Sequence, residues 1–225
     1  MIENKWKAIL FDLDGTLVDT HALILKCYAH ATHTHLQQPM QPEIWERMTG
    51  LPLEKIFREL CAHYSTEATP ELLDTLKQTY RAHMRVHAHT VQAFPGVVEM
   101  LDNVRTQGYR MAIVTTKNRP MAINHVETTA LSGYFEFMIT GDDVTHMKPH
   151  PEPFLRALEA LELPGTEVAH VGDSQHDING AREAGIHTIA ALWGTDNEAA
   201  LRAATPDHIL DTPASLATVL EVPRG

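Results

Sequence analysis

Ala8-Ile9-Leu10-Phe11-Asp12-Leu13-Asp14-Gly15-Thr16 is the stretch of sequence that decides the fold of this chain. Its first four residues form a short apolar run, which predicts a buried β-strand. Two carboxylates follow the run directly, and Gly15 allows the backbone to turn sharply after them. We therefore expect Asp12 and Asp14 to face one pocket at the end of this strand.

An isolated Asp-x-Asp-Gly pattern is more often a turn or a calcium-binding loop than a catalytic site. A calcium loop of the EF-hand type requires glycine at its sixth position and glutamate at its twelfth. Counted from Asp12, glycine comes fourth and the twelfth residue is Leu23. An apolar strand also precedes the pattern, so the context favours a site at a strand end.

Similar β-rich runs recur along the chain and alternate with helical patterns. The predicted strands are residues 8–11, 111–115, 135–140, 168–171 and 188–192. The predicted helices between them are residues 97–105, 119–131, 153–161 and 176–184, and a short edge strand at 207–210 precedes a final helix at 213–220. This alternation predicts an α/β fold built from parallel β-α units.

In an open parallel sheet, ligands bind beyond the carboxyl ends of the strands. Asp12, Thr115 and Asp173 follow the first, second and fourth predicted strands, and Lys148 lies in the loop after the third. We expect these four polar residues to converge on one edge of the sheet.

Residues 17–91 interrupt the alternation, because they hold helical patterns without a convincing strand. The helical patterns are at 23–32, 42–48, 53–64 and 70–87. We expect an all-helical domain at 17–91, inserted into a core formed by residues 1–16 and 92–225. Phe94-Pro95-Gly96 closes the insert and starts a helix, with proline near the helix N-terminus where its missing N–H costs nothing.

Composition excludes several classes of function. The 225 residues suit one core plus an insert, and the net charge of -11 without a Lys/Arg cluster argues against nucleic acid or an anionic membrane as a partner. Two distant cysteines give no disulfide framework and no zinc signature. The first apolar run is too short for a signal peptide or a membrane span, so a cytoplasmic location is expected. The fifteen histidines contain no His-Glu-x-x-His and are expected to be solvated or packed.

Four segments together resemble a known family. Asp12-Leu-Asp14-Gly-Thr-Leu-Val resembles the first motif of the haloacid dehalogenase superfamily. Thr115 resembles its second motif, Lys148-Pro-His-Pro-Glu-Pro153 its third, and Gly172-Asp-Ser-Gln-His-Asp177 its fourth. The motifs occur in order and the resemblance covers the whole chain. It implies a Rossmann-like parallel-sheet core with an inserted helical cap, and a magnesium-dependent phosphate-ester hydrolase.

The resemblance also implies roles for single residues. Asp12 is expected to attack phosphorus and form an aspartyl-phosphate, while Asp14 acts as general acid and base. Thr115 is expected to donate its hydroxyl to a phosphate oxygen, and Lys148 to balance negative charge on the nucleophile and the transferring group.

The implied magnesium ligands are Asp12, the backbone carbonyl of Asp14, and Asp173, because Mg²⁺ prefers octahedral oxygen coordination. Asp177 is expected to bind metal-bound water or to orient Lys148. The alternative for Asp177 is a helix N-terminal carboxylate that interacts favourably with the helix dipole.

Backbone N–H groups are the remaining expected phosphate contacts, at Leu13, Thr116 and Lys117. Many related phosphatases carry asparagine directly after the second-motif threonine, whereas this chain carries Thr116. The departure weakens an assignment to a subfamily but leaves the expected mechanism unchanged.

The helical insert resembles the cap of the phosphoglycolate phosphatase and β-phosphoglucomutase subgroup. Thr49 and Gly50 resemble the cap loop that reaches the substrate, with Arg47 as a further expected contact; simple helix punctuation is the alternative. Gly172 stands where the mutases usually carry glutamate, and Thr115 where they typically carry serine, so hydrolysis is favoured.

Phosphoglycolate-like monoesters are the favoured substrates of the predicted enzyme. Inorganic pyrophosphate, a broad range of sugar phosphates and mutase activity are the alternatives, and a non-catalytic binding role is the least favoured. The expected partner is a small phosphorylated metabolite, and the expected oligomeric state is a monomer or a homodimer.

Overall fold

The computed structural model describes residues 6–39, 44, 51–195 and 197–220. The chain forms two compact units: a core unit of residues 1–19 and 92–225, and an insert unit of residues 20–91. The insert therefore begins at Thr20, whereas the sequence patterns place its start at Leu17. The difference arises from a two-residue ladder in which β2 (Val18–Asp19) pairs antiparallel with β3 (Gln92–Ala93). Strands this short show no periodicity in a sequence.

The core unit is built on a six-stranded parallel sheet with the strand order β5-β4-β1-β6-β7-β8. The strands are β1 Ala8–Phe11, β4 Arg110–Val114, β5 Met138–Ile139, β6 Val168–Gly172, β7 His187–Ala191 and β8 His208–Leu210. The central strands β1 and β6 are buried along their whole length, as their apolar runs predict. The predicted α/β class is confirmed.

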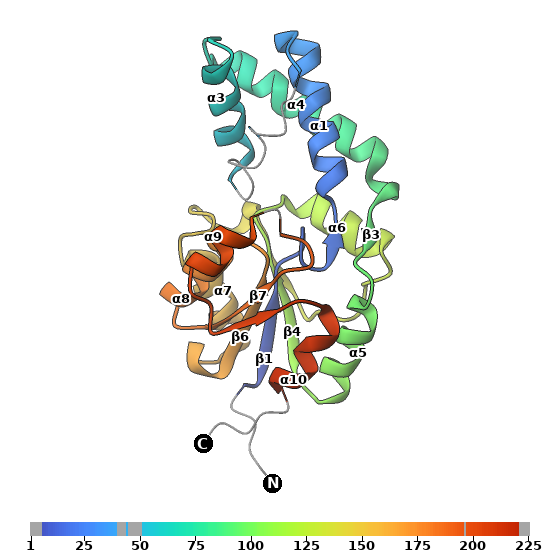
Figure 1. Cartoon of the computed structure of the whole chain (residues 1–225), viewed down its shortest axis with the longest axis vertical. Coiled ribbons are helices and arrows are strands. Elements are labelled where there is room, and N and C mark those ends of the chain that lie inside the picture. The colour runs from blue at the N-terminus through green and yellow to red at the C-terminus, as the bar shows by residue number, and fades with distance from the viewer. Residues whose placement is uncertain (1–5, 40–43, 45–50, 196, 221–225) are drawn as a thin grey trace. The chain divides into compact units, whose positions relative to one another are not determined.

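Helices cover both faces of this sheet (Figure 1). They are α5 Val97–Thr106, α6 Arg119–Thr128, α7 Glu152–Leu161, α8 Gln175–Glu183, α9 Glu198–Ala203 and α10 Leu216–Leu220. On one face, Phe154 of α7 and Ala181 of α8 pack against Leu10 and Val114 of the central strands. Helices α5 and α10 lie on the opposite face (Figure 1). The strands are thus held as a rigid layer, which fixes the positions of the residues that follow them.

One predicted strand was wrong in extent, and one helix was not predicted. The strand predicted at 135–140 is only Met138–Ile139, because β5 is the sheet edge and pairs with β4 at Ile113 and Val114 alone. Helix α9 was not predicted. It spans six residues and begins where the Asn197 side chain accepts the N–H of Ala200, a cap whose signal is short.

The insert unit contains the helices α1 His21–Leu36, α3 Leu53–His63 and α4 Pro70–His87. The start of α4 follows a standard pattern, since Pro70 occupies the first turn and the Thr69 hydroxyl accepts the N–H of Leu72. Tyr28, Phe57 and Leu76, one from each helix, share a buried cluster. The helix predicted at 42–48 lies outside the described residues except for Ile44, which is helical.

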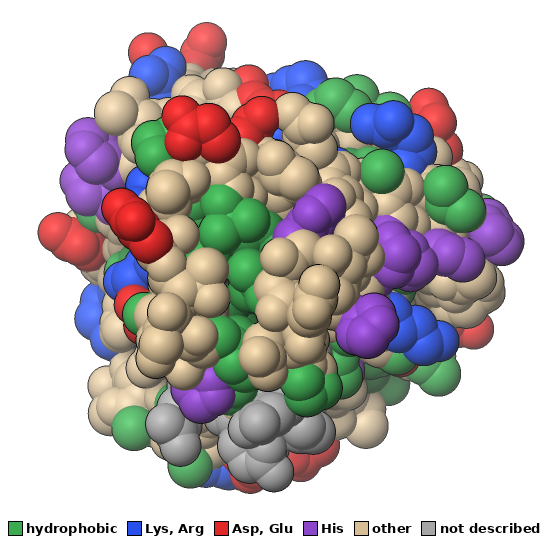
Figure 2. Space-filling view, turned by 90° about the horizontal axis from the view of Figure 1, so that it is seen from above, with side chains coloured by type: hydrophobic (Ala, Val, Ile, Leu, Met, Phe, Trp, Pro, Cys, Tyr) green, Lys and Arg blue, Asp and Glu red, His purple; other side chains and the backbone are tan. Residues whose placement is uncertain are grey.

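None of the helices within the described residues has the length and the apolar character that crossing a membrane requires. Figure 2 shows one face of the molecule, on which acidic and basic side chains are interspersed and histidines are exposed at several places. No large patch of one sign of charge is visible in that view. This distribution accords with the absence of a Lys/Arg cluster from the sequence.

Candidate active site

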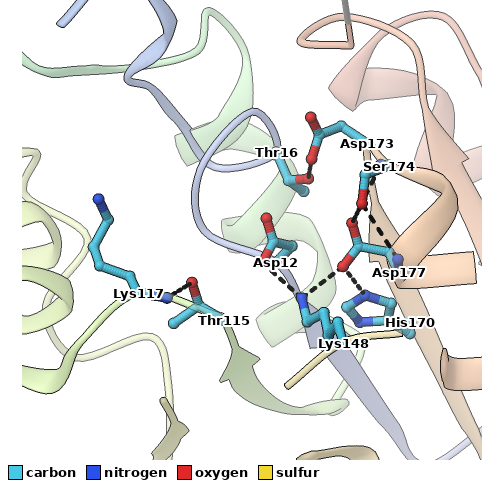
Figure 3. A network of polar contacts seen from close by, with 9 residues as sticks. All are labelled: Asp12, Thr16, Thr115, Lys117, Lys148, His170, Asp173, Ser174 and Asp177. Atoms are coloured by element: carbon cyan, nitrogen blue, oxygen red, sulfur yellow. Dashed lines mark hydrogen bonds and ion pairs between the residues drawn. The ribbon is translucent and has the colours of Figure 1, made fainter. Parts of the chain in front are cut away.

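The register of the sheet brings the predicted site residues to one edge. Phe11, the last residue of β1, pairs with Ile113 of β4 and with Val171 of β6. The residues just beyond these strand ends include Asp12, Thr115 and Asp173, and all three side chains are buried. The predicted convergence of strand-end residues is therefore present in the structure (Figure 3).

Gly15 permits the close approach of two of these strand ends. It has a positive φ of 79°, and a Cβ at this position would lie 2.2 Å from Oδ2 of Asp173. The hydroxyl of Thr16 then donates to Oδ1 of Asp173 at 3.2 Å. Only glycine fits at position 15 without displacing Asp173.

Lys148 lies at the centre of the polar network (Figure 3). Its Nζ is 2.7 Å from Oδ1 of Asp12 and 2.6 Å from Oδ1 of Asp177, and the residue is 4% exposed. Burial by itself lowers the pKa of Lys148, but the two carboxylates outweigh that effect and raise it above the ordinary value. Lys148 is therefore an ammonium at neutral pH, held against the predicted nucleophile.

Asp177 accepts hydrogen bonds on both carboxylate oxygens. Its Oδ1 accepts from Lys148 and is 3.1 Å from Nε2 of His170, and its Oδ2 accepts from the backbone N–H and the hydroxyl of Ser174. Burial raises the pKa of Asp177, but Lys148 and His170 hold it well below its usual range. A carboxylate with these partners is suited to orienting Lys148. It also caps the start of α8, so the helix-terminus alternative applies at the same time.

Three carboxylates in the network provide a donor set for a divalent cation. One oxygen from each of Asp12, Asp173 and Asp177 lies within 4.8 Å of the others. Burial, followed by the charges of Asp12 and Asp177, raises the pKa of Asp173 well above its usual value. With all three carboxylates ionised, the single ammonium of Lys148 would balance only one of them, and two negative charges would remain in a buried site. A divalent ion with oxygen ligands fits this charge and this donor set.

Asp14 is not one of these three carboxylates, but its charge contributes to the raised pKa of Asp12. Its side chain is 24% exposed, and its Oδ1 is 3.1 Å from Nζ of Lys117 and 3.9 Å from Nδ1 of His125. The role of its backbone carbonyl as a metal ligand remains a prediction.

Thr115 is 3% exposed, and its hydroxyl oxygen accepts the backbone N–H of Lys117 at 3.2 Å. That bond engages the Lys117 N–H that was predicted to bind phosphate, while the Thr115 O–H remains a donor. The Lys117 side chain, which the sequence analysis left without a role, points to Asp14 instead. The N–H groups of Leu13 and Thr116 remain predicted phosphate contacts.

His170 and Ser174 belong to the network but were not predicted. His170 is fully buried in β6 between apolar residues, and its ring packs edge-on against Phe154 with 4.8 Å between centroids. A histidine inside an otherwise apolar strand was the available signal. The expected cap contacts Arg47, Thr49 and Gly50 lie outside the described residues.

Comparison with known proteins identifies the family of this site. The sequence profile of the haloacid dehalogenase-like hydrolases matches residues 9–191. The chain belongs to the haloacid dehalogenase-like hydrolase family. The curated relative "Pyrophosphatase PpaX" of Bacillus thuringiensis strain Al Hakam is 34% identical over 216 residues, which are 96% of this chain and 97% of that protein. The Bacillus mycoides protein of the same name is 34% identical over 98% of this chain and all of its own length.

Solved structures place the chain among the same haloacid dehalogenase-like proteins. A Haemophilus somnus protein described as a predicted phosphoglycolate phosphatase is 25% identical, with a TM-score of 0.86 over 96% of this chain and 99% of its own. A Thermotoga maritima protein described as a proposed β-phosphoglucomutase is 26% identical, with a TM-score of 0.75 over 96% and 98%. The predicted family, its fold and the assignment to the phosphoric ester hydrolases are confirmed.

His125 next to Asp14 leads to a prediction about acid stability. It is fully buried on α6, neither ring nitrogen has a hydrogen-bond partner, and burial lowers its pKa from 6.5 to about 4. The folded state thus binds this proton more weakly than the unfolded state, so stability falls as the pH drops below 6.5. The measurement is the free energy of unfolding in urea at about pH 7.5 and at about pH 5. Between these pH values we expect His125→Leu to lose about 1–2 kcal/mol less stability than the wild type.

The control for this experiment is His33→Gln, which changes an exposed histidine on α1 of the insert unit. Its loss of stability with falling pH should match that of the wild type. Parallel losses in wild type and His125→Leu would show that His125 does not carry the acid sensitivity.

Proposed function

We propose that this protein is a magnesium-dependent phosphatase that hydrolyses a small phosphorylated metabolite through an aspartyl-phosphate at Asp12. The observation that carries the proposal is the buried Lys148 ammonium, 2.7 Å from Oδ1 of Asp12, in a cluster of three carboxylates. Burial raises the pKa of Asp12 to about 7, and the ammonium opposes that rise, which favours the ionised, nucleophilic form and reduces its repulsion of a phosphate anion.

Two displacements at phosphorus make up the proposed reaction. An oxygen of Asp12 forms a bond to phosphorus, the bond to the leaving oxygen breaks, and that oxygen takes a proton from Asp14. Asp14 then accepts a proton from water, whose oxygen attacks phosphorus and releases inorganic phosphate from Asp12. Mg²⁺, held by Asp12 and Asp173 with the Asp14 carbonyl, would neutralise the charge of the transferring group.

The surroundings of Asp14 favour a leaving group that carries negative charge. Nζ of Lys117 lies 3.1 Å from Oδ1 of Asp14, and the Lys117 side chain is only 9% exposed. A cation beside the general acid attracts an anionic leaving group, such as phosphate or a carboxylate-bearing alcohol, more than a neutral one.

Pyrophosphate is the first substrate that we propose to test, and phosphoglycolate is the second. Both present a negative charge next to the scissile bond. Relatives named pyrophosphatase are 34% identical to this chain, against 25% for a relative described as a predicted phosphoglycolate phosphatase. This ordering differs from the sequence-based preference for a phosphoglycolate-like monoester, because it also takes account of the relatives named pyrophosphatase and of the Lys117 ammonium beside Asp14.

A phosphate-release screen over some tens of phosphorylated metabolites, with Mg²⁺, tests the proposal. We expect the highest kcat/KM for pyrophosphate or phosphoglycolate, and we expect Lys117→Met to reduce kcat/KM for that substrate by about 10-fold or more. Lys117→Met should have a much smaller effect on the turnover of an aryl phosphate whose leaving group carries no charged substituent. Conversion of β-glucose 1-phosphate to glucose 6-phosphate without free phosphate would instead establish a mutase.

A further inference from the structure

The loop that carries Lys148 also carries a second group of metal-ligand side chains. Its sequence, Thr145-His-Met-Lys148-Pro-His-Pro-Glu152, places a histidine two residues before and two residues after Lys148. Lys148 is buried in the catalytic network, whereas His146 and His150 are exposed. The histidines therefore form a separate cluster on the outer side of this loop.

Glu152 is held in place by the loop backbone. Its Oε1 accepts the N–H of Thr145 and its Oε2 accepts the N–H of His146, each at 2.9 Å. These bonds lower the pKa of Glu152 to about 2, so it is a carboxylate throughout the neutral range. Its side chain is 19% exposed, which leaves it accessible to an ion although it is fixed.

The two imidazoles both contact Glu152, one at its carboxylate and the other at its backbone N–H. Nδ1 of His146 is 3.0 Å from Oε2 of Glu152, and Nδ1 of His150 accepts the backbone N–H of Glu152 at 3.1 Å. The two rings stack with 4.6 Å between centroids. One donor atom from each of the three residues lies within 4.8 Å of the other two.

We propose that His146, His150 and Glu152 form a second metal site, which binds a divalent ion of the zinc class. Two imidazole nitrogens and one carboxylate oxygen suit Zn²⁺, with water as the fourth ligand, whereas Mg²⁺ prefers oxygen ligands throughout. The site is thus selective against the ion expected at the catalytic carboxylates.

The geometry requires little rearrangement to accept such an ion. Two ligand atoms of a tetrahedral Zn²⁺, each about 2.0–2.1 Å from the metal, lie about 3.3 Å apart. Nδ1 of His146 and Oε2 of Glu152 are already 3.0 Å apart, so an ion can replace the proton between them. The two backbone N–H groups on Glu152 then orient the ligand oxygen, as partners of metal ligands commonly do. Binding at Nδ1 of His150 exchanges one N–H···N bond for a metal bond.

The position of the ligands gives the site a consequence for the loop. They bracket Lys148 in sequence, so an ion that joins residues 146, 150 and 152 ties both ends of the segment that delivers the buried ammonium. Bound metal is therefore expected to reduce local opening of this loop.

Calorimetric titration of the full chain with Zn²⁺ in excess Mg²⁺ tests the proposal. We expect one tightly bound equivalent, at least about 10-fold weaker in His146→Ala, in His150→Ala and in Glu152→Gln. Zn²⁺ should also slow amide hydrogen exchange at residues 145–152 in the wild type but not in these three variants. Without Zn²⁺ the three variants should keep the circular dichroism spectrum of the wild type, which separates lost ligands from lost folding.

Two control variants distinguish this site from others in the chain. His83→Ala alters a ring that stacks on His30 and makes a tilted contact with His87 in the insert unit, and Asp173→Asn alters the catalytic carboxylates. Both should retain the tight Zn²⁺ equivalent. The proposal is overturned if the equivalent survives in His146→Ala and His150→Ala, or if it is lost in either control.

Discussion

Replacing Asp12 with asparagine is expected to reduce phosphate release from an aryl phosphate by at least about 10³-fold, because an amide cannot serve as the attacking nucleophile. Asparagine keeps the size of the side chain, so the buried position beside Lys148 remains filled. The measurement is steady-state turnover with saturating Mg²⁺. The thermal midpoint should be recorded alongside, since the variant also removes an ion-pair partner of Lys148.

The matched control for Asp12→Asn is Asp19→Asn, which makes the same change at an exposed position of the same unit. It should keep the turnover of the wild type. If Asp12→Asn retains that turnover, the covalent mechanism proposed for this site is wrong.

Asp173→Asn is expected to abolish the response of the enzyme to magnesium and to reduce turnover by at least about 10²-fold. The substitution removes one of the carboxylates that we propose to hold the ion. In the wild type Mg²⁺ should raise the thermal midpoint, because it binds the folded state, and excess EDTA should remove both that rise and the activity.

The direction in which Asp173→Asn changes the stability of the metal-free protein provides a second test. Burial and two neighbouring carboxylates raise the pKa of Asp173, so its ionised form destabilises the metal-free folded state at neutral pH. We therefore expect Asp173→Asn to be more stable than the wild type in EDTA and unresponsive to Mg²⁺. Asp211→Asn, an exposed control, should behave as the wild type. Full wild-type activity in excess EDTA would contradict the metal assignment.

The strand-end residues were predictable because parallel strands share a direction. Once β1, β4 and β6 are recognised as apolar runs, the residues after them must emerge at one edge of the sheet. The placement of Asp12, Thr115 and Asp173 at that edge needed no further information, but their roles depended on the linked family pattern. Lys148 depended on the linked family pattern, because a lysine before proline in a loop is commonly solvated.

The missed features depend on contacts between segments that are distant in sequence. The place of His170 in the network depends on its contacts with the Asp177 carboxylate and the Phe154 ring, and neither residue is next to His170 in the chain. The ion pair between Lys117 and Asp14 joins two different strand ends. The β2–β3 ladder pairs the segment before the insert with the segment after it, and each strand contributes only two residues. No local periodicity encodes such pairings.

The central claim is that Asp12 becomes phosphorylated during turnover, and trapping this intermediate tests the claim most directly. Asp14→Asn is the suitable variant with an aryl phosphate, because this leaving group needs little protonation whereas release of the phosphoryl group needs the general base. Acid quenching after one turnover, reduction with borohydride and peptide mass spectrometry should find homoserine at position 12. Reduction at another residue, or no modified residue while phosphate is released, would contradict the mechanism.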